Sequence, residues 1–205
     1  MNAPPRERIL DAADAVFGEV GFDAASTREI ADRCGVNKAL IHYYFKSKDG
    51  LLESLLEGYY ARLTDALRAI LLRPTGSLRE RMRALVGGYL DFLHANRNFV
   101  RIVQREAGGG RHVDLVAERT LPLLALGRAL LRERYPATHS GAMAAEQLLV
   151  SFYGMLVAGF TFGPVLERLL DTDPTSDAAL ALRKAHVERL VDLVFDALED
   201  PEAAR

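Results

Sequence analysis

The chain has 205 residues, of which 49% are hydrophobic and 26% charged, so it can bury a substantial core and has the charge content of an ordinary soluble protein. Its net charge of −2 argues against a generally basic nucleic-acid coat, and its most apolar stretch, 148–162, is too short to cross a bilayer. With one cysteine and no apolar signal segment at the start of the sequence, we expect no internal disulfide, no membrane association and a cytoplasmic location.

Helical periodicity runs through almost every segment, and no convincing strand pattern is present. A first helix follows Pro5 and ends at Gly21. Ser26 and Glu29 form a capping box, in which the hydroxyl accepts from the amide three residues later and the Glu reaches back. The second helix that begins there stops at Gly35.

A third helix is predicted from its N-cap Asn37 to about Tyr44. The order helix, glycine turn, helix is that of a helix-turn-helix, whose second helix enters the major groove of DNA. Five cations and two acidic residues give residues 26–48 a charge of +3 and leave about −5 on the rest. A locally basic segment on an acidic body suits a protein that presents one face to phosphate.

The rest of the chain predicts further helices. Ser47 caps a long one to about Leu72, and residues 73–77 break the pattern. Ser77 and Glu80 form a second capping box. The helices expected after it cover about 77–95, 98–107, 122–135, 142–162 and 176–199, with a flexible joint at glycines 108–110 and a loop over 163–175.

The fold class predicted is therefore all-α, with nine or ten helices. An N-terminal three-helix domain with the helix-turn-helix covers 1–48, and a larger helical domain covers 49–205.

Candidate DNA contacts are short or polar residues at the start of the third helix and cations around it. Asn and Lys side chains can bond base edges or phosphate, and Ala or Leu can touch a thymine methyl. The start of the second helix offers amides and a positive dipole to a phosphate. The predicted contacts are Thr27, Arg28, Asn37, Lys38, Ala39, Leu40, His42, Tyr43 and Lys48, with Ile41 and Phe45 facing inward.

Residues 9–59 resemble the N-terminal domain of TetR-type transcriptional regulators. The resemblance rests on Gly21-Phe22, on Thr27 to Ala31 as T-R-E-I-A, and on Gly35 to Lys48 as G-V-N-K-A-L-I-H-Y-Y-F-K-S-K. It implies a ligand-responsive regulator, most commonly a repressor, which binds a palindromic operator as a homodimer and is released by a small-molecule effector.

Two residues in this segment, His42 and Cys34, each allow two interpretations. His42 stands where the family usually has a phosphate-contacting Tyr, so the contact there is either weaker or pH-sensitive. Cys34 either fills the core before the turn or acts as a redox switch, and its small-residue position favours the first reading.

The last two long helices carry apolar residues at i, i+3, i+4 spacing, and small residues that let helices approach closely. Such stripes are usually core, but the resemblance to a dimeric family implies a four-helix dimer interface. Its predicted members are Gly154, Met155, Ala158, Phe162, Val187, Leu190, Val191, Val194 and Phe195.

By the same resemblance the middle helices should enclose an effector pocket for an apolar or anionic molecule. Arg97, Arg101 and Arg105 recur at four-residue spacing, which fits either a solvated basic face or a site for an anionic head group. The predicted pocket residues are Tyr89, Phe92, His94, Arg97, Phe99, Arg101, Gln104, Arg105, Phe152 and Tyr153.

No catalytic motif, paired-cysteine motif or His spacing for a metal is present, so we expect no enzyme activity, cofactor or metal. The alternatives within DNA binding are a co-repressor-dependent regulator, an activator, or a non-specific DNA-bundling protein.

Overall fold

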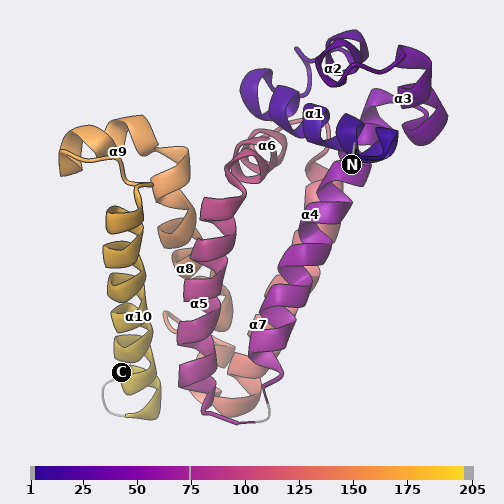
Figure 1. The fold of residues 1–205 in the computed structure, drawn as a ribbon. Helices are drawn as coiled ribbons and strands as arrows, with labels where there is room; N and C mark the ends of the chain where they lie inside the picture. The colour runs from indigo at the N-terminus through magenta and orange to yellow at the C-terminus, as the bar shows by residue number, and fades with distance from the viewer. Residues whose placement is uncertain (1–2, 74, 201–205) are drawn as a thin grey trace. The chain divides into compact units, whose positions relative to one another are not determined.

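The computed structural model describes residues 3–73 and 75–200, so Pro74 in the predicted break lies outside the described residues. The described residues form ten α-helices, one 3₁₀ turn and no strand, which confirms the all-α prediction (Figure 1). The helices are α1 Pro5–Val20, α2 Thr27–Cys34, α3 Lys38–Phe45, α4 Lys48–Leu71, α5 Leu78–Ala95, α6 Arg97–Ala107, α7 Val113–Arg134, α8 Ala145–Thr161, α9 Gly163–Leu170 and α10 Asp177–Glu199, with η1 at Pro136–His139.

The predicted caps form. The Ser26 hydroxyl accepts from the amide of Glu29 at 3.1 Å, and the Ser47 hydroxyl accepts from the amide of Gly50 at 2.9 Å. The Ser77–Glu80 box is reciprocal, because the Ser77 amide donates to the Glu80 carboxylate at 2.7 Å and the Ser77 hydroxyl accepts from the Glu80 amide at 3.2 Å. These contacts fix where α2, α4 and α5 begin.

Two predicted boundaries were wrong. A new helix was expected to begin at Pro122, but α7 is continuous from Val113 with that proline inside it. Proline has no N–H, so the carbonyl oxygen one turn before Pro122 lacks its helical donor. Because Leu121 and Pro122 are exposed, water can donate to that oxygen instead. The loop expected after residue 162 instead contains α9, in whose first turn Pro164 lies, where a preset φ favours a helix start.

The chain divides into two compact units. The first contains the chain up to Arg62 together with Asn96–Arg119, and the second contains Leu63–Ala95 together with the chain from Thr120 onward. The predicted boundary at residue 48 stays a prediction, but the unit that contains the first three helices also contains α6. Within this unit α6 packs on α1.

In the second unit α10 lies alongside α5 (Figure 1). Its inner face joins a buried cluster that includes Val86, Leu90, Leu131, Ala145, Leu156, Val187, Val191, Phe195 and Leu198.

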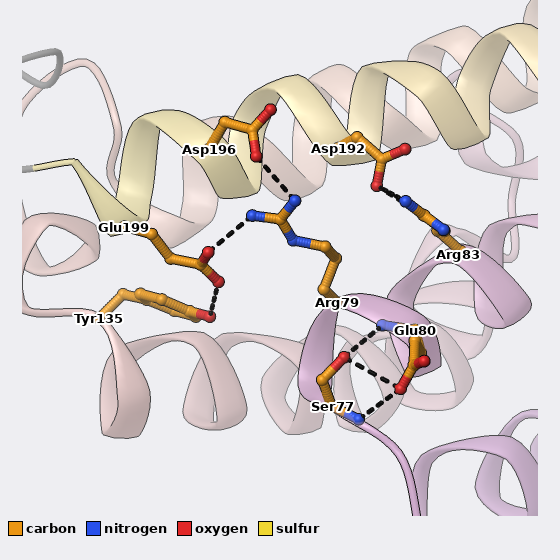
Figure 2. Close-up of polar contacts among 8 residues, drawn as sticks. All are labelled: Ser77, Arg79, Glu80, Arg83, Tyr135, Asp192, Asp196 and Glu199. Carbon is orange, nitrogen blue, oxygen red and sulfur yellow. Dashed lines mark hydrogen bonds and ion pairs between the residues drawn. The ribbon is translucent and has the colours of Figure 1, made fainter.

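Polar contacts line the same helix pair (Figure 2). Arg79 of α5 bonds Asp196 and Glu199 of α10, each at 2.7 Å, and Arg83 pairs with Asp192. These contacts fix the register of α10 against α5.

Candidate nucleic-acid interface

The second and third helices meet at a tight turn. Gly35 ends α2 with φ 65°, a left-handed conformation that side chains disfavour, and Asn37 starts α3 by accepting from the amide of Ala39 at 2.9 Å. Ile30 and Ile41 are buried at 0% and 2% exposure. The apolar residues of both helices therefore face the core and leave the opposite face of α3 to solvent.

That outer face carries most of the predicted contacts. Lys38, Ala39 and His42 are exposed, and Leu40 is half-buried. Tyr43 is 68% exposed and stacks edge to face on Tyr44, with ring centroids 5.0 Å apart. Tyr44 is 38% exposed. The surface therefore has two aromatic rings next to the polar side chains.

The start of α2 adds a second group. Arg28 is exposed and Thr27 half-buried, and both follow the capped N-terminus, where amides and the helix dipole favour an anion. Among the described residues, Arg28 and Lys38 have neither a hydrogen bond nor an ion pair. Their charges are therefore available to an external phosphate.

Lys48 lies in a different setting from the one expected. Its ammonium donates to the carbonyl oxygens of Phe22 at 2.8 Å, Ala25 at 2.9 Å and Asp23 at 3.4 Å, and it lies 4.3 Å from the centre of the Phe22 ring. An ammonium has three protons, and all three have acceptors inside the protein. Lys48 holds the connection between α1 and α2 in this structure, and its role as a phosphate contact stays a prediction.

Other cations of this unit are also used internally. Arg8 donates to the carbonyl oxygens of Cys34 at 2.6 Å and Gly35 at 3.1 Å, which satisfies the end of α2. Arg33 pairs with Glu19 at 2.6 Å, and this contact lowers the pKa of the Glu19 carboxyl. Cys34 is half-buried and its thiol donates to the Ile30 carbonyl at 3.1 Å, as expected of a core filler.

The predicted effector residues do not lie in one unit. Arg97, Phe99, Arg101, Gln104 and Arg105 belong to the first unit, whereas Tyr89, Phe92, His94, Phe152 and Tyr153 belong to the second.

Arg105 and Phe99 make contacts that hold α6 within the first unit. Arg105 donates to the carbonyl oxygens of Phe17 at 3.2 Å and Gly18 at 3.3 Å, at the end of α1. Phe99 is 3% exposed and contacts the rings of Tyr59 and Tyr60. These contacts build α6 into the unit that contains α3, a role that the arginine spacing did not indicate.

Asp14 connects three helices, and no sequence pattern indicated this role. It accepts from the Tyr59 hydroxyl at 2.7 Å and from the Asn98 amide at 2.9 Å, so it joins α1, α4 and α6. Burial raises the pKa of Tyr59 above its usual value, and the bond to Asp14 raises it further. The hydroxyl therefore remains a donor at neutral pH.

Three of the residues predicted for the dimer interface on α10 face the interior of the protomer instead of solvent. Val187, Val191 and Phe195 are exposed by 0%, 2% and 3%, because they pack in the core of their own protomer. Leu190, Val194, Met155 and Ala158 are half-buried, whereas Gly154 and Phe162 are exposed. The outward apolar residues of α8–α10 are Val150, Phe162, Val165, Leu169, Leu170, Leu182 and Leu193.

Among the described residues no single helix is both long and apolar enough to cross a membrane. One pair, α8 with α9, passes that test of length and composition only together, and it is bent by 86°.

Known proteins share both the sequence and the fold. The model of the tetR family of bacterial regulatory proteins matches residues 9–55, and that of the tetracyclin repressor-like C-terminal domain matches residues 79–194. The probable HTH-type transcriptional regulator YttP of Bacillus subtilis is 34% identical over 139 residues, 66% of this chain and 62% of that protein.

Two further comparisons cover different lengths. The HTH-type transcriptional regulator BetI of Escherichia coli (strain K12 / DH10B) is 37% identical over 92 residues, 44% of this chain and 47% of that protein. The structure of the fatty acid degradation regulator FadR from Bacillus halodurans is 25% identical, with a TM-score of 0.69, and covers 93% of this chain and 96% of its own. The alignments with YttP and BetI thus span less than two thirds of those proteins.

Proposed function

The chain belongs to the tetR family of bacterial regulatory proteins, and we propose that it is a ligand-responsive transcriptional repressor. In this proposal it binds a palindromic operator as a homodimer, and a small molecule releases it. The observation that carries the proposal is the outer face of α3, where exposed Lys38, His42 and Tyr43 stand on a helix whose inner side is anchored by Ile41 and Phe45.

The chemistry of this face fits the major groove. Lys38 can bond a base edge or a phosphate, the Ala39 methyl can contact a thymine, and Tyr43 can donate to a phosphate oxygen. Arg28 at the start of α2 supplies a further cation to the same strand of DNA. One copy of such a helix reads only a few base pairs, so two copies on a two-fold site give useful specificity.

The second copy is proposed to dock on the outward apolar surface of α8–α10. Leu182 and Leu193 share the solvent side of α10, and Gly154 on α8 has no neighbouring atom within 4 Å of where a Cβ would lie. Exposed aliphatic residues in such number mark interaction surfaces on soluble proteins. A two-fold dimer buries the same surface of both copies.

The effector is proposed to bind in the second unit, where Phe92 and Tyr153 are half-buried aromatic residues. Release requires only that it bind better to an arrangement unsuited to DNA, and a coupling of about 1–3 kcal/mol would change DNA affinity about 5–150-fold. FadR, named for fatty acid degradation, makes fatty acids reasonable members of a screen that also contains aromatic acids.

The test is a band shift with the DNA upstream of the gene, with and without unrelated competitor DNA. We expect a shifted band that survives the competitor, is lost in Tyr43→Ala and is retained in the matched surface variant Arg73→Ala. A band removed equally by any competitor would favour the DNA-bundling alternative. Addition of a compound that raises the melting temperature should release the DNA, whereas tighter binding would identify a co-repressor.

A further inference from the structure

His112, at the junction of α6 and α7, lies between two carboxylates. Its Nδ1 is 2.8 Å from Oε2 of Glu106 in α6, and its Nε2 is 3.1 Å from Oδ1 of Asp49 in α4. The imidazole is 11% exposed and the Glu106 side chain 8%. All three residues belong to the first compact unit.

Each ring nitrogen thus lies within hydrogen-bonding distance of a carboxylate oxygen. A neutral imidazole has one N–H donor and one lone pair, so it can donate to only one of the two carboxylates. Its lone pair would then face the oxygen of the other, largely buried, carboxylate. Only the imidazolium donates to both ionised carboxylates, and its charge offsets one of their two negative charges.

Other aromatic and charged groups lie around the ring. Phe22 packs on the ring edge to face, with centroids 4.5 Å apart, and Arg111 lies 3.5 Å from the Asp49 carboxylate. Lys48 lies on the Phe22 ring. Two acidic and three basic side chains, His112 included, thus meet where α4, α6 and the connection from α1 converge. The hydrogen bond from His112, more than any other contact, lowers the pKa of the Asp49 carboxyl.

The contact between His112 and Asp49 is linked to α3 through the first turn of α4. Asp49 is followed by Gly50, where a Cβ would lie 2.3 Å from the carbonyl oxygen of Phe45, the last residue of α3. Lys46, between the two helices, has φ 66°, which is costly for a residue with a side chain. The junction is therefore tightly packed and strained, so it depends on contacts that hold the start of α4 in place.

We infer that His112 is a positioning residue for DNA binding, whose imidazolium ties α6 to the first turn of α4 and so fixes α3 for the major groove. The inference rests on the proposed function. When the ring loses its proton, one of the two bonds is lost and the junction loosens. DNA must then supply the ordering free energy, and affinity falls.

The sign of the pH dependence follows from the two kinds of group. Loss of the imidazolium proton breaks the tie on the alkaline side. On the acid side the tie persists until Asp49 becomes protonated, and that happens below the usual range of an aspartate because its pKa is lowered. Across the range of about pH 5.5 to about 8, in which histidine changes charge, DNA affinity should fall as pH rises.

The first measurement needs no DNA. Nitrogen chemical shifts of the His112 ring, assigned with His112→Gln, should show both ring nitrogens protonated in the folded full-length protein near neutral pH. A ring that is neutral there would overturn the inference.

The second measurement follows affinity against pH for a duplex that the protein enriches from a random-sequence pool. His42 is a second histidine, on the proposed DNA surface itself, so the parent for this series is His42→Tyr, the residue usual in the family. We expect its affinity to fall by at least about fivefold across the range, the lower end of typical couplings between sites. His112→Gln should flatten the profile, and His139→Gln, in η1, should leave it unchanged.

Glu106→Gln separates a pH-dependent tie from plain packing. Its amide can donate to Nδ1 of a neutral ring while Nε2–H still donates to Asp49, so the variant should bind DNA well at the alkaline end without a pH dependence. A profile like that of the parent, in either Glu106→Gln or His112→Gln, would contradict the inference. If no duplex is enriched, the proposed function itself fails, and the role of His112 in DNA binding falls with it.

Discussion

The first three helices and the last three leave different kinds of side chain in solvent. In α1–α3 the large apolar or aromatic residues that remain exposed are Val20, Tyr43 and Tyr44, and the two tyrosines lie on α3 beside cations. In α8–α10 they are mostly aliphatic and include Val150, Val165, Leu169, Leu182 and Leu193, together with the aromatic Phe162 between α8 and α9. The exposed side chains of α1–α3 suit a charged partner such as DNA. Those of α8–α10 suit another apolar protein surface.

Within the second region the contrast runs across a single helix. On α10, Val187 and Val191 are buried in the protomer, whereas Leu182 and Leu193 are 75% and 49% exposed. Both sets are aliphatic, so only their direction decides whether they stabilise the fold or a dimer.

The largest effect is expected from an inward change on that helix. Val187→Asp places an unpaired charge among residues of the buried cluster, and such changes cost about 4 kcal/mol or more. We expect no soluble, cooperatively unfolding protein in circular dichroism and denaturant titration. A folded variant would show that the inner face of α10 is not core.

An outward change should act on assembly instead. Leu182→Glu should leave the far-ultraviolet spectrum unchanged but convert the proposed dimer into monomers in sedimentation velocity, because each copy then brings an unpaired charge into the proposed interface. DNA affinity should fall with it. Leu72→Glu, at a leucine that is 67% exposed beyond α4, is the matched control and should stay dimeric. If both variants remain dimeric, the docking surface lies elsewhere.

Lys38 and Lys48, both in the first compact unit, are expected to act differently. Lys48→Met removes hydrogen bonds to three carbonyl oxygens and should lower the free energy of unfolding by about 1.5–3 kcal/mol, the range for bonds to a charged group. Lys38→Met should leave stability unchanged but reduce the slope of log affinity against log salt by about 0.9, as for the loss of one phosphate contact. Urea titration and salt-dependent fluorescence anisotropy measure the two effects. If Lys48→Met instead reduces the salt dependence and Lys38→Met lowers stability, Lys48 is the lysine that contacts DNA phosphate.

The smallest effect concerns the end of α1. Arg105→Leu removes a cation from the carbonyl oxygens of Phe17 and Gly18, and it should lower the free energy of unfolding by about 0.5–1 kcal/mol. Arg101→Leu, one turn earlier on α6 and exposed, should have no effect in the same urea titration. Equal losses from both would mean that the cap adds nothing to stability.

The sequence predicted the caps and the inner and outer faces of α3, because both depend on residues a few positions apart. It did not predict the direction of the stripe on α10, because i, i+3, i+4 spacing marks an apolar face without saying what covers it. Nor could the sequence show where the charged groups of long lysine and arginine side chains lie. Lys48 and Arg105 carry charge that fits DNA or a ligand, but their side chains end on backbone carbonyl oxygens more than twenty residues away in the sequence.

The contacts of His112 were equally invisible, because Asp49 lies 63 positions before it and is brought near only by the fold.

The most direct test of the account is the sequence pattern that the wild-type protein enriches from a random duplex pool. If α3 reads DNA and the outer surface of α8–α10 pairs two copies, the enriched pattern is an inverted repeat with half-site centres about one helical turn, or about 34–36 Å, apart. A lone half-site, or no enrichment at all, would contradict the account.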